Sequence, residues 1–237
     1  MIYFILCHVM FYVKLCSISS TNSFPMLHNF ISGEGGSVDE DQLEHWFSTE
    51  LQEILLFFDP ARILNSDETG VGWRSLGKKT LVFREKKTEH GSKAHKERFT
   101  CMLTCSASGR MYPPLMIGTA KQPQAFGRNG WWTSQMSYKI NRFHYDHSTN
   151  AWVTKVIFDK WIKELSELLT SENPNEHFVL LVDNFAGHNV NTPSNITLKF
   201  MPPNSTSRTQ PLDAGIIKAF KVLYIVLNRF QKKALLS

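Results

Sequence analysis

Apolar residues recur at helical spacing in three stretches of the chain and predict three amphipathic helices. The first stretch covers 37–59, where Ser37 and Glu40 match a capping box and Asp59-Pro60 ends the helix. Its stripe consists of Leu43, Trp46, Phe47, Leu51, Ile54, Leu55 and Phe58. The second stretch runs from Val153 to Leu169, and the third begins near Pro211, a residue tolerated in a first helical turn.

Alternating or continuous apolar runs predict the strands. Ile63-Leu64 forms a short strand that leads into a turn over 65–70, and Phe99–Ser106 alternates and makes a hairpin with 115–117. The continuous run Phe178–Val182 is typical of a central strand covered on both faces, and 196–200 alternates again. This order of elements predicts an α/β fold with a mixed central sheet flanked by helices.

Three regions differ in composition. Residues 1–36 form an apolar N-terminal segment and linker without the charged start of a signal peptide, 37–59 the acidic amphipathic helix, and 60–237 the main domain. No stretch approaches the roughly 18 apolar residues that a membrane span needs. We therefore expect no membrane association.

Charge is divided unevenly along the chain. Residues 62–237 carry 25 basic and 13 acidic residues, a net charge of +12, which favours polyanionic partners and above all nucleic acid. Nine basic residues lie in the stretch from Arg74 to Arg98, both included. The final helix adds Lys218. We predict that the DNA backbone is held by Lys86, Lys87, Lys93, Lys96 and Lys218, although a merely solvated loop would have a similar composition.

Three aspartates stand where predicted elements begin or end. Asp67 follows the first strand, Asp183 ends the Phe178–Val182 run, and Asp213 lies in the first turn of the last helix. Acids gathered at strand ends require compensation by cations, and Mg²⁺ prefers such oxygen ligands. Taken singly, Asp183 also suits a turn and Asp213 a helix dipole.

The sequences around these aspartates resemble the DDE superfamily endonuclease domain, in the pogo and Tigger branch that includes the jerky proteins and centromere protein B. The resemblance rests on Asn65–Gly70, Leu180–Asn184 and Pro202–Ser207 followed by Gln210–Asp213, with 29 residues between Asp183 and Asp213. It implies an RNase H-like fold, two Mg²⁺ or Mn²⁺ ions, and Asp67, Asp183 and Asp213 as catalytic metal ligands. Glu68 is passed over because neighbouring strand residues point to opposite faces. His188 also matches a family position, near the phosphate or as a structural residue.

The resemblance also implies a nuclear, DNA-bound transposon-derived nuclease that cleaves and transfers strands, working as a homodimer or with a protein that carries helix-turn-helix modules. Family members carry such modules ahead of the catalytic domain, whereas 66 residues precede Asp67 here, and we expect the domain to be truncated at its C-terminal end. The three retained acids favour an enzyme. The missing modules favour the alternative, a catalytically silent DNA-binding or chromatin-associated protein or a decayed transposase fragment.

Overall fold

A six-stranded sheet forms the centre of the molecule, with the strand order β4-β3-β2-β1-β5-β6. The computed structural model describes residues 39–72, 98–123, 143–205 and 209–234. Neighbouring strands are antiparallel in β1–β2 and β2–β3 and parallel in β3–β4, β1–β5 and β5–β6. The predicted mixed sheet is confirmed. Its strands are β1 (Ile63–Gly72), β2 (Arg98–Ser106), β3 (Leu115–Gly118), β4 (His144–His147), β5 (Phe178–Val182) and β6 (Ile196–Phe200).

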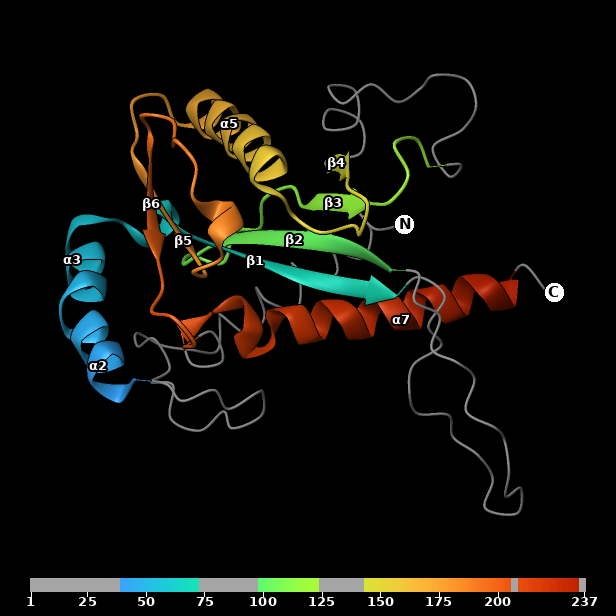
Figure 1. Cartoon of the computed structure of the whole chain (residues 1–237), viewed down its shortest axis with the longest axis horizontal. Coiled ribbons are helices and arrows are strands. Elements are labelled where there is room, and N and C mark those ends of the chain that lie inside the picture. Colours follow the sequence, from blue (N-terminus) through green and yellow to red (C-terminus); the bar gives the residue numbers. More distant parts are fainter. Residues whose placement is uncertain (1–38, 73–97, 124–142, 206–208, 235–237) are drawn as a thin grey trace, which may run out of the picture.

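Two long helices, α5 (Lys155–Glu172) and α7 (Ile217–Ala234), cover opposite faces of this sheet (Figure 1). The α5 face holds a core that includes Leu64, Phe158 and Leu180, and the α7 face holds one that includes Leu103 and Phe220. All five residues of β5 are buried, as predicted from its continuous apolar run. Because side chains alternate along a strand, neighbouring residues of β1 and β5 serve different faces.

The predicted N-terminal helix is interrupted, contrary to the single helix expected over 37–59. It consists of α2 (Glu40–Ser48) and α3 (Glu50–Phe57), with Thr49 between them at φ −114° and ψ −80°. The hydroxyls of Ser48 and Thr49 both donate to the carbonyl of His45, at 3.1 and 2.6 Å, a back-bonding pattern that bends helices. The N-cap is Asp39, whose carboxylate accepts from the amide of Gln42.

Two strands depart from the sequence prediction. The turn expected over 65–70 is instead the middle of β1, which pairs with β2 from Leu64↔Ser106 to Gly72↔Arg98. The antiparallel partner supplies backbone hydrogen bonds that the polar composition of Asn65–Gly70 did not reveal. The polar stretch His144–His147 also forms a strand, β4, because the parallel partner β3 supplies its backbone hydrogen bonds.

The final helix starts with an irregular turn, η4 (Leu212–Ile216), before α7 begins. Gly215 has φ 140°, a conformation that residues with a side chain rarely adopt. Asp213 therefore lies on a wide turn ahead of the regular helix. Among the described helices, none combines the length and apolar character that crossing a membrane requires. Residues 1–36 and the predicted basic stretch before Arg98, with Lys86, Lys87, Lys93 and Lys96, lie outside the described residues.

Truncation of Leu169 to Ala should destabilise the fold strongly. Leu169 is fully buried on α5, and such a cavity costs about 2–5 kcal/mol of unfolding free energy. Val156→Ala on the same helix is the matched control, because Val156 is 78% exposed and should cost less than about 0.5 kcal/mol. Urea denaturation of both variants measures the difference. Equal decreases in stability would contradict the packing of α5 described here.

Candidate active site

Asn65 ties together the three segments that carry the predicted aspartates. Its buried side-chain amide donates to the carbonyl of Leu181 on β5 (3.1 Å) and to Oε1 of Gln210 (2.9 Å). Its side-chain oxygen accepts from the backbone amide of Leu212 in η4 (3.2 Å). Gln210 in turn donates to the carbonyl of Ser66 on β1 (3.1 Å). We call this group of four bonds the Asn65 clamp; it fixes the ends of β5 and η4 against β1.

Asn65 and Gln210 were not predicted as site residues, although both belong to the motifs that carry the family resemblance. A polar residue two positions before an aspartate resembles turn composition as closely as it resembles a buried support. The sequence indicates them only through their places in the family-like motifs, two residues before Asp67 and three residues before Asp213. Their burial, at 5% and 3% exposure, is what identifies them as supports.

Asp67 lies in the middle of β1, on the face of the strand that the Asn65 clamp occupies. It is only 7% exposed, and its Oδ1 accepts from the amide of Glu68 (2.8 Å). Burial, followed by the charge of Asp213, raises the pKa of Asp67 to about 8, while a hydrogen bond from Gln210 acts in the opposite direction. A carboxyl group in this position resists ionisation at neutral pH unless a cation is supplied.

Asp213 is exposed in η4, and its backbone amide donates to the carbonyl of Gln210 (3.2 Å). Its pKa is raised by desolvation and by the charge of Asp183, against the lowering effect of Lys221. Asp213 is thus within electrostatic range of both Asp67 and Asp183. Lys218, predicted to contact DNA, is exposed in the first turn of α7, five residues beyond Asp213.

Asp183 follows β5 directly and contacts His188 in the short helix η3 (Ala186–His188). His188 Nδ1 lies 2.8 Å from Asp183 Oδ1, and its Nε2 lies 2.7 Å from Glu68 Oε1. His188 is 1% exposed, and its ring packs 4.5 Å from that of Phe158. A buried ring with both nitrogens engaged does not reach a phosphate, so the structural alternative for His188 is the one that this geometry favours.

The contacts of His188 also determine its charge. Burial lowers its pKa, but contacts with Asp183 and Glu68 outweigh burial and raise the pKa to about 10. An imidazolium therefore stands between two carboxylates at neutral pH. Ligand atoms of Glu68, Asp183 and His188 lie within 4.8 Å of one another, a spacing at which the three side chains could hold a metal ion in place of the proton. This group, the Glu68–His188–Asp183 bridge, acts as an internal ion pair on the α5 face.

The predicted aspartates offer carboxylate oxygens, although among the described residues only Asp183 of the three belongs to the group close enough to hold one metal ion. Oδ1 of Asp183 is buried and close to the His188 ring, yet within the described ranges no hydrogen bond of good geometry reaches it. Burial, and then the charge of Asp213, raises the pKa of the Asp67 carboxyl. Oxygen ligands of this kind match Mg²⁺ and Mn²⁺.

Replacing Asp67 with Asn should stabilise the metal-free protein at high pH. An unfolded Asp ionises near pH 4, whereas the pKa of folded Asp67 is about 8. Since the folded pKa is the higher one, wild type loses stability as the pH rises from about 4 to about 8. We expect Asp67→Asn to gain on the order of 1–3 kcal/mol over wild type at pH 8 and little at pH 4.

Urea denaturation in a chelator at both pH values measures this gain. Asp159→Asn is the control, because Asp159 forms a surface ion pair with Lys163 and should change stability by less than about 0.5 kcal/mol. An Asp67→Asn variant less stable than wild type at pH 8 would contradict the assignment of Asp67 as a desolvated acid.

Comparison with solved structures identifies the fold. The Mos1 transposase paired-end complex with left transposon end aligns with 89% of this chain and 55% of its own, at a TM-score of 0.52 and 10% identity. The Mos1 mariner paired-end complex with Mn gives a TM-score of 0.51 at 11% identity, over 87% of this chain and 55% of that one. At this identity the likeness concerns the fold alone, and the predicted RNase H-like fold is confirmed.

Sequence comparison identifies the relatives. CENP-B homolog protein 2 of Schizosaccharomyces pombe is 29% identical over 82% of this chain and 37% of its own length. Tigger transposable element-derived protein 4 of Mus musculus is 28% identical over 82% and 36%. The Jerky protein homolog of Homo sapiens is 30% identical over 67% and 28%. The chain thus spans about a third of the length of these relatives. Because the DDE superfamily endonuclease family matches residues 96–235, the chain belongs to that family, with relatives of the pogo and Tigger type.

Proposed function

We propose that this chain is a transposon-derived nuclease domain that cleaves and joins DNA strands with divalent metal ions. The observation that carries the proposal is the Asn65 clamp, which binds the segments bearing Asp67, Asp183 and Asp213 to one another through buried hydrogen bonds. Such a support would hold three carboxylates in a fixed relation, as phosphoryl transfer by positioning requires.

Asp67, Asp183 and Asp213 are the proposed metal ligands, and each has a distinct environment. Asp67 is held rigidly inside β1, Asp183 is oriented by His188, and Asp213 reaches the site from the solvent side. These residues would hold a pair of Mg²⁺ or Mn²⁺ ions, whose chemistry would be to activate a water or a 3′-hydroxyl and to stabilise the leaving oxygen. The His188 cation offsets the charges of Glu68 and Asp183, so that it limits repulsion before any metal binds.

DNA is the proposed partner, and the nucleus is the proposed location. The net charge of +12 over 62–237 supports binding to the phosphate backbone, with Lys86, Lys87, Lys93 and Lys96 in the basic stretch and Lys218 beside Asp213. Phosphate contacts alone carry no sequence information. The proposed protein partner is a second copy of this chain or a protein that carries helix-turn-helix modules, and such modules would supply the choice of target.

Residues 38–237 should nick supercoiled plasmid weakly and without sequence preference. Mn²⁺ should support more nicking than Mg²⁺, because Mg²⁺ demands a near-ideal octahedral ligand set. Asp183→Asn keeps the size of the side chain but removes a ligand charge, and it should reduce nicking below detection while DNA binding is retained. Gel electrophoresis of the plasmid and a filter-binding assay measure the two effects.

Asp159→Asn is the matched control and should nick like wild type, since Asp159 lies on α5 in a surface ion pair. If wild type and Asp183→Asn are equally inert with Mn²⁺ while both bind DNA, the catalytic proposal fails. A catalytically silent DNA-binding protein would then be the better description of the chain.

Replacing Lys86, Lys87 and Lys93 together with Ala should weaken DNA binding at low salt. Each phosphate that the variant no longer neutralises lowers the slope of log affinity against log salt by roughly one. The triple variant should therefore show a slope smaller by roughly two to three. Fluorescence anisotropy across a salt series measures it, and an unchanged slope would remove this stretch from the proposed DNA-binding surface.

A further inference from the structure

A hollow of about 310 Å³ opens on the α5 face of β1, next to the Glu68–His188–Asp183 bridge. Glu68 lines the hollow and also pairs with His188, which contacts Asp183, so the hollow adjoins the Glu68–His188–Asp183 bridge. Gly70 contributes no side chain and leaves room beside β1. The residues that give the hollow its chemical character are Glu68, Gly70, Arg98, Thr100, Trp152 and Phe185.

Two aromatic rings in the wall of this hollow are unusually exposed. Trp152 is 56% exposed and Phe185 is 43% exposed, although neighbouring Val153 is buried. Among the described residues, Phe57 on α3 is the other large aromatic of comparable exposure. Rings of this size gain free energy when covered, and a pair in one hollow indicates a binding surface.

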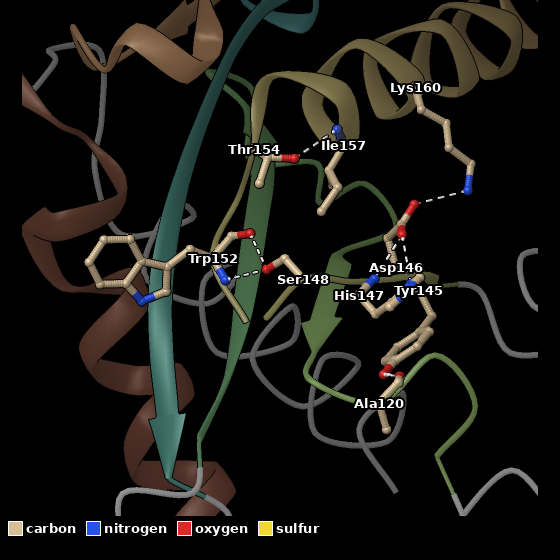
Figure 2. A network of polar contacts seen from close by, with 9 residues as sticks. All are labelled: Ala120, Tyr145, Asp146, His147, Ser148, Trp152, Thr154, Ile157 and Lys160. Carbon is tan, nitrogen blue, oxygen red and sulfur yellow. Dashed lines mark hydrogen bonds and ion pairs between the residues drawn. The ribbon is translucent and has the colours of Figure 1, made fainter. Parts of the chain in front are cut away.

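The backbone holds Trp152 firmly despite the exposure of its ring. Its amide donates to Ser148 Oγ and its carbonyl accepts from the same hydroxyl, both at 2.8 Å. Figure 2 shows this pair of bonds, with the indole lying away from the network that joins Asp146 and Lys160. Ala151, directly before Trp152, is fully buried and has φ 54°. Thr154, two residues after Trp152, is the N-cap of α5.

Phe185 is fixed in a different way. Its ring meets that of His188 edge to face at 5.3 Å, and it covers Gly187 so closely that a Cβ there would collide with it. Both rings are therefore presented by ordered backbone. A planar ligand that covers either ring would lose little ordering entropy, because the contacts described above already hold both residues.

Arg98 adds a positive charge to the hollow, which favours a ligand that carries phosphate over one that is purely apolar. Its guanidinium carbon lies 5.7 Å from the centre of the Trp152 ring, in cation–π geometry. Exposed aromatic rings beside arginine are the arrangement that stacks nucleobases while holding their phosphates. The carboxylate of Glu68 adds an acceptor for an exocyclic amino group. A purely apolar ligand would use neither the charge of Arg98 nor the carboxylate of Glu68.

We propose that this hollow binds one unpaired nucleobase of the DNA strand whose phosphodiester lies at the aspartates. The proposal rests on the proposed function, because the strand is the one that the nuclease site would hold. The base must be unpaired, since a base inside a duplex has no free face to offer a protein ring. The domain thereby prefers DNA that is frayed, bulged or single-stranded beside the position of cleavage.

Binding of short duplexes to the full chain in a chelator tests this, so that no strand is cut. One duplex is fully paired, and the other has the same sequence with a single unpaired 2-aminopurine. Wild type should bind the second roughly ten-fold more tightly, with quenching of the 2-aminopurine fluorescence. Trp152→Ala and Phe185→Ala should lose this preference, whereas Trp152→Phe should retain most of it.

Phe57→Ala is the matched control, because Phe57 is a 71%-exposed aromatic outside the hollow, and it should keep the preference. Absence of a preference in wild type, or its persistence in Trp152→Ala, overturns the inference while binding of the paired duplex leaves the proposed function standing. An equal loss of preference in Phe57→Ala also overturns it. Failure of wild type to bind either duplex overturns the proposed function and this inference together.

Discussion

The side chain of Asn65 makes the hydrogen bonds on which the rest of the candidate site depends. A buried amide must satisfy its donors and its acceptor, and Asn65 does so with β5, with Gln210 and with the start of η4. An apolar residue there would leave the carbonyl of Leu181 and the amide of Leu212 without these partners, at a cost of about 1–3 kcal/mol each. The clamp therefore fixes the backbone next to Asp213 to β1, because Gln210 and Leu212 are both hydrogen-bonded to that strand.

Alternation along β1 separates two kinds of chemistry within two residues. Asp67 points to the face of the clamp, where burial and the charge of Asp213 raise its pKa to about 8. Glu68 points to the α5 face, where His188 neutralises it at 2.7 Å. The face of the clamp thus carries a desolvated acid, Asp67, which we propose as a metal ligand. The other face is charge-balanced and opens into the hollow that carries Trp152.

Charge compensation differs between the two faces of β1. The Glu68–His188–Asp183 bridge contains its own cation, His188. The two carboxylates are therefore held near each other without a bound ligand. Asp67 has Gln210 as a neutral hydrogen-bond donor, which leaves the cost of ionising a desolvated carboxyl in place. Functional sites commonly carry such local instability, and a bound cation would remove it.

The sequence by itself determined the elements whose apolar pattern is strong and the family to which they belong. α5, β2, β5 and β6 follow from periodicity, because burial of their faces leaves a regular signal. Asp67, Asp183 and Asp213 could be singled out from their motifs. Only the tertiary structure decided that Asn65–Gly70 is strand, since its hydrogen bonds come from β2, more than thirty residues away in the pairing Asp67↔Leu103. It also decided that Asn65 is a support and that His188 is buried, because a polar residue's partners depend on contacts that no local pattern records.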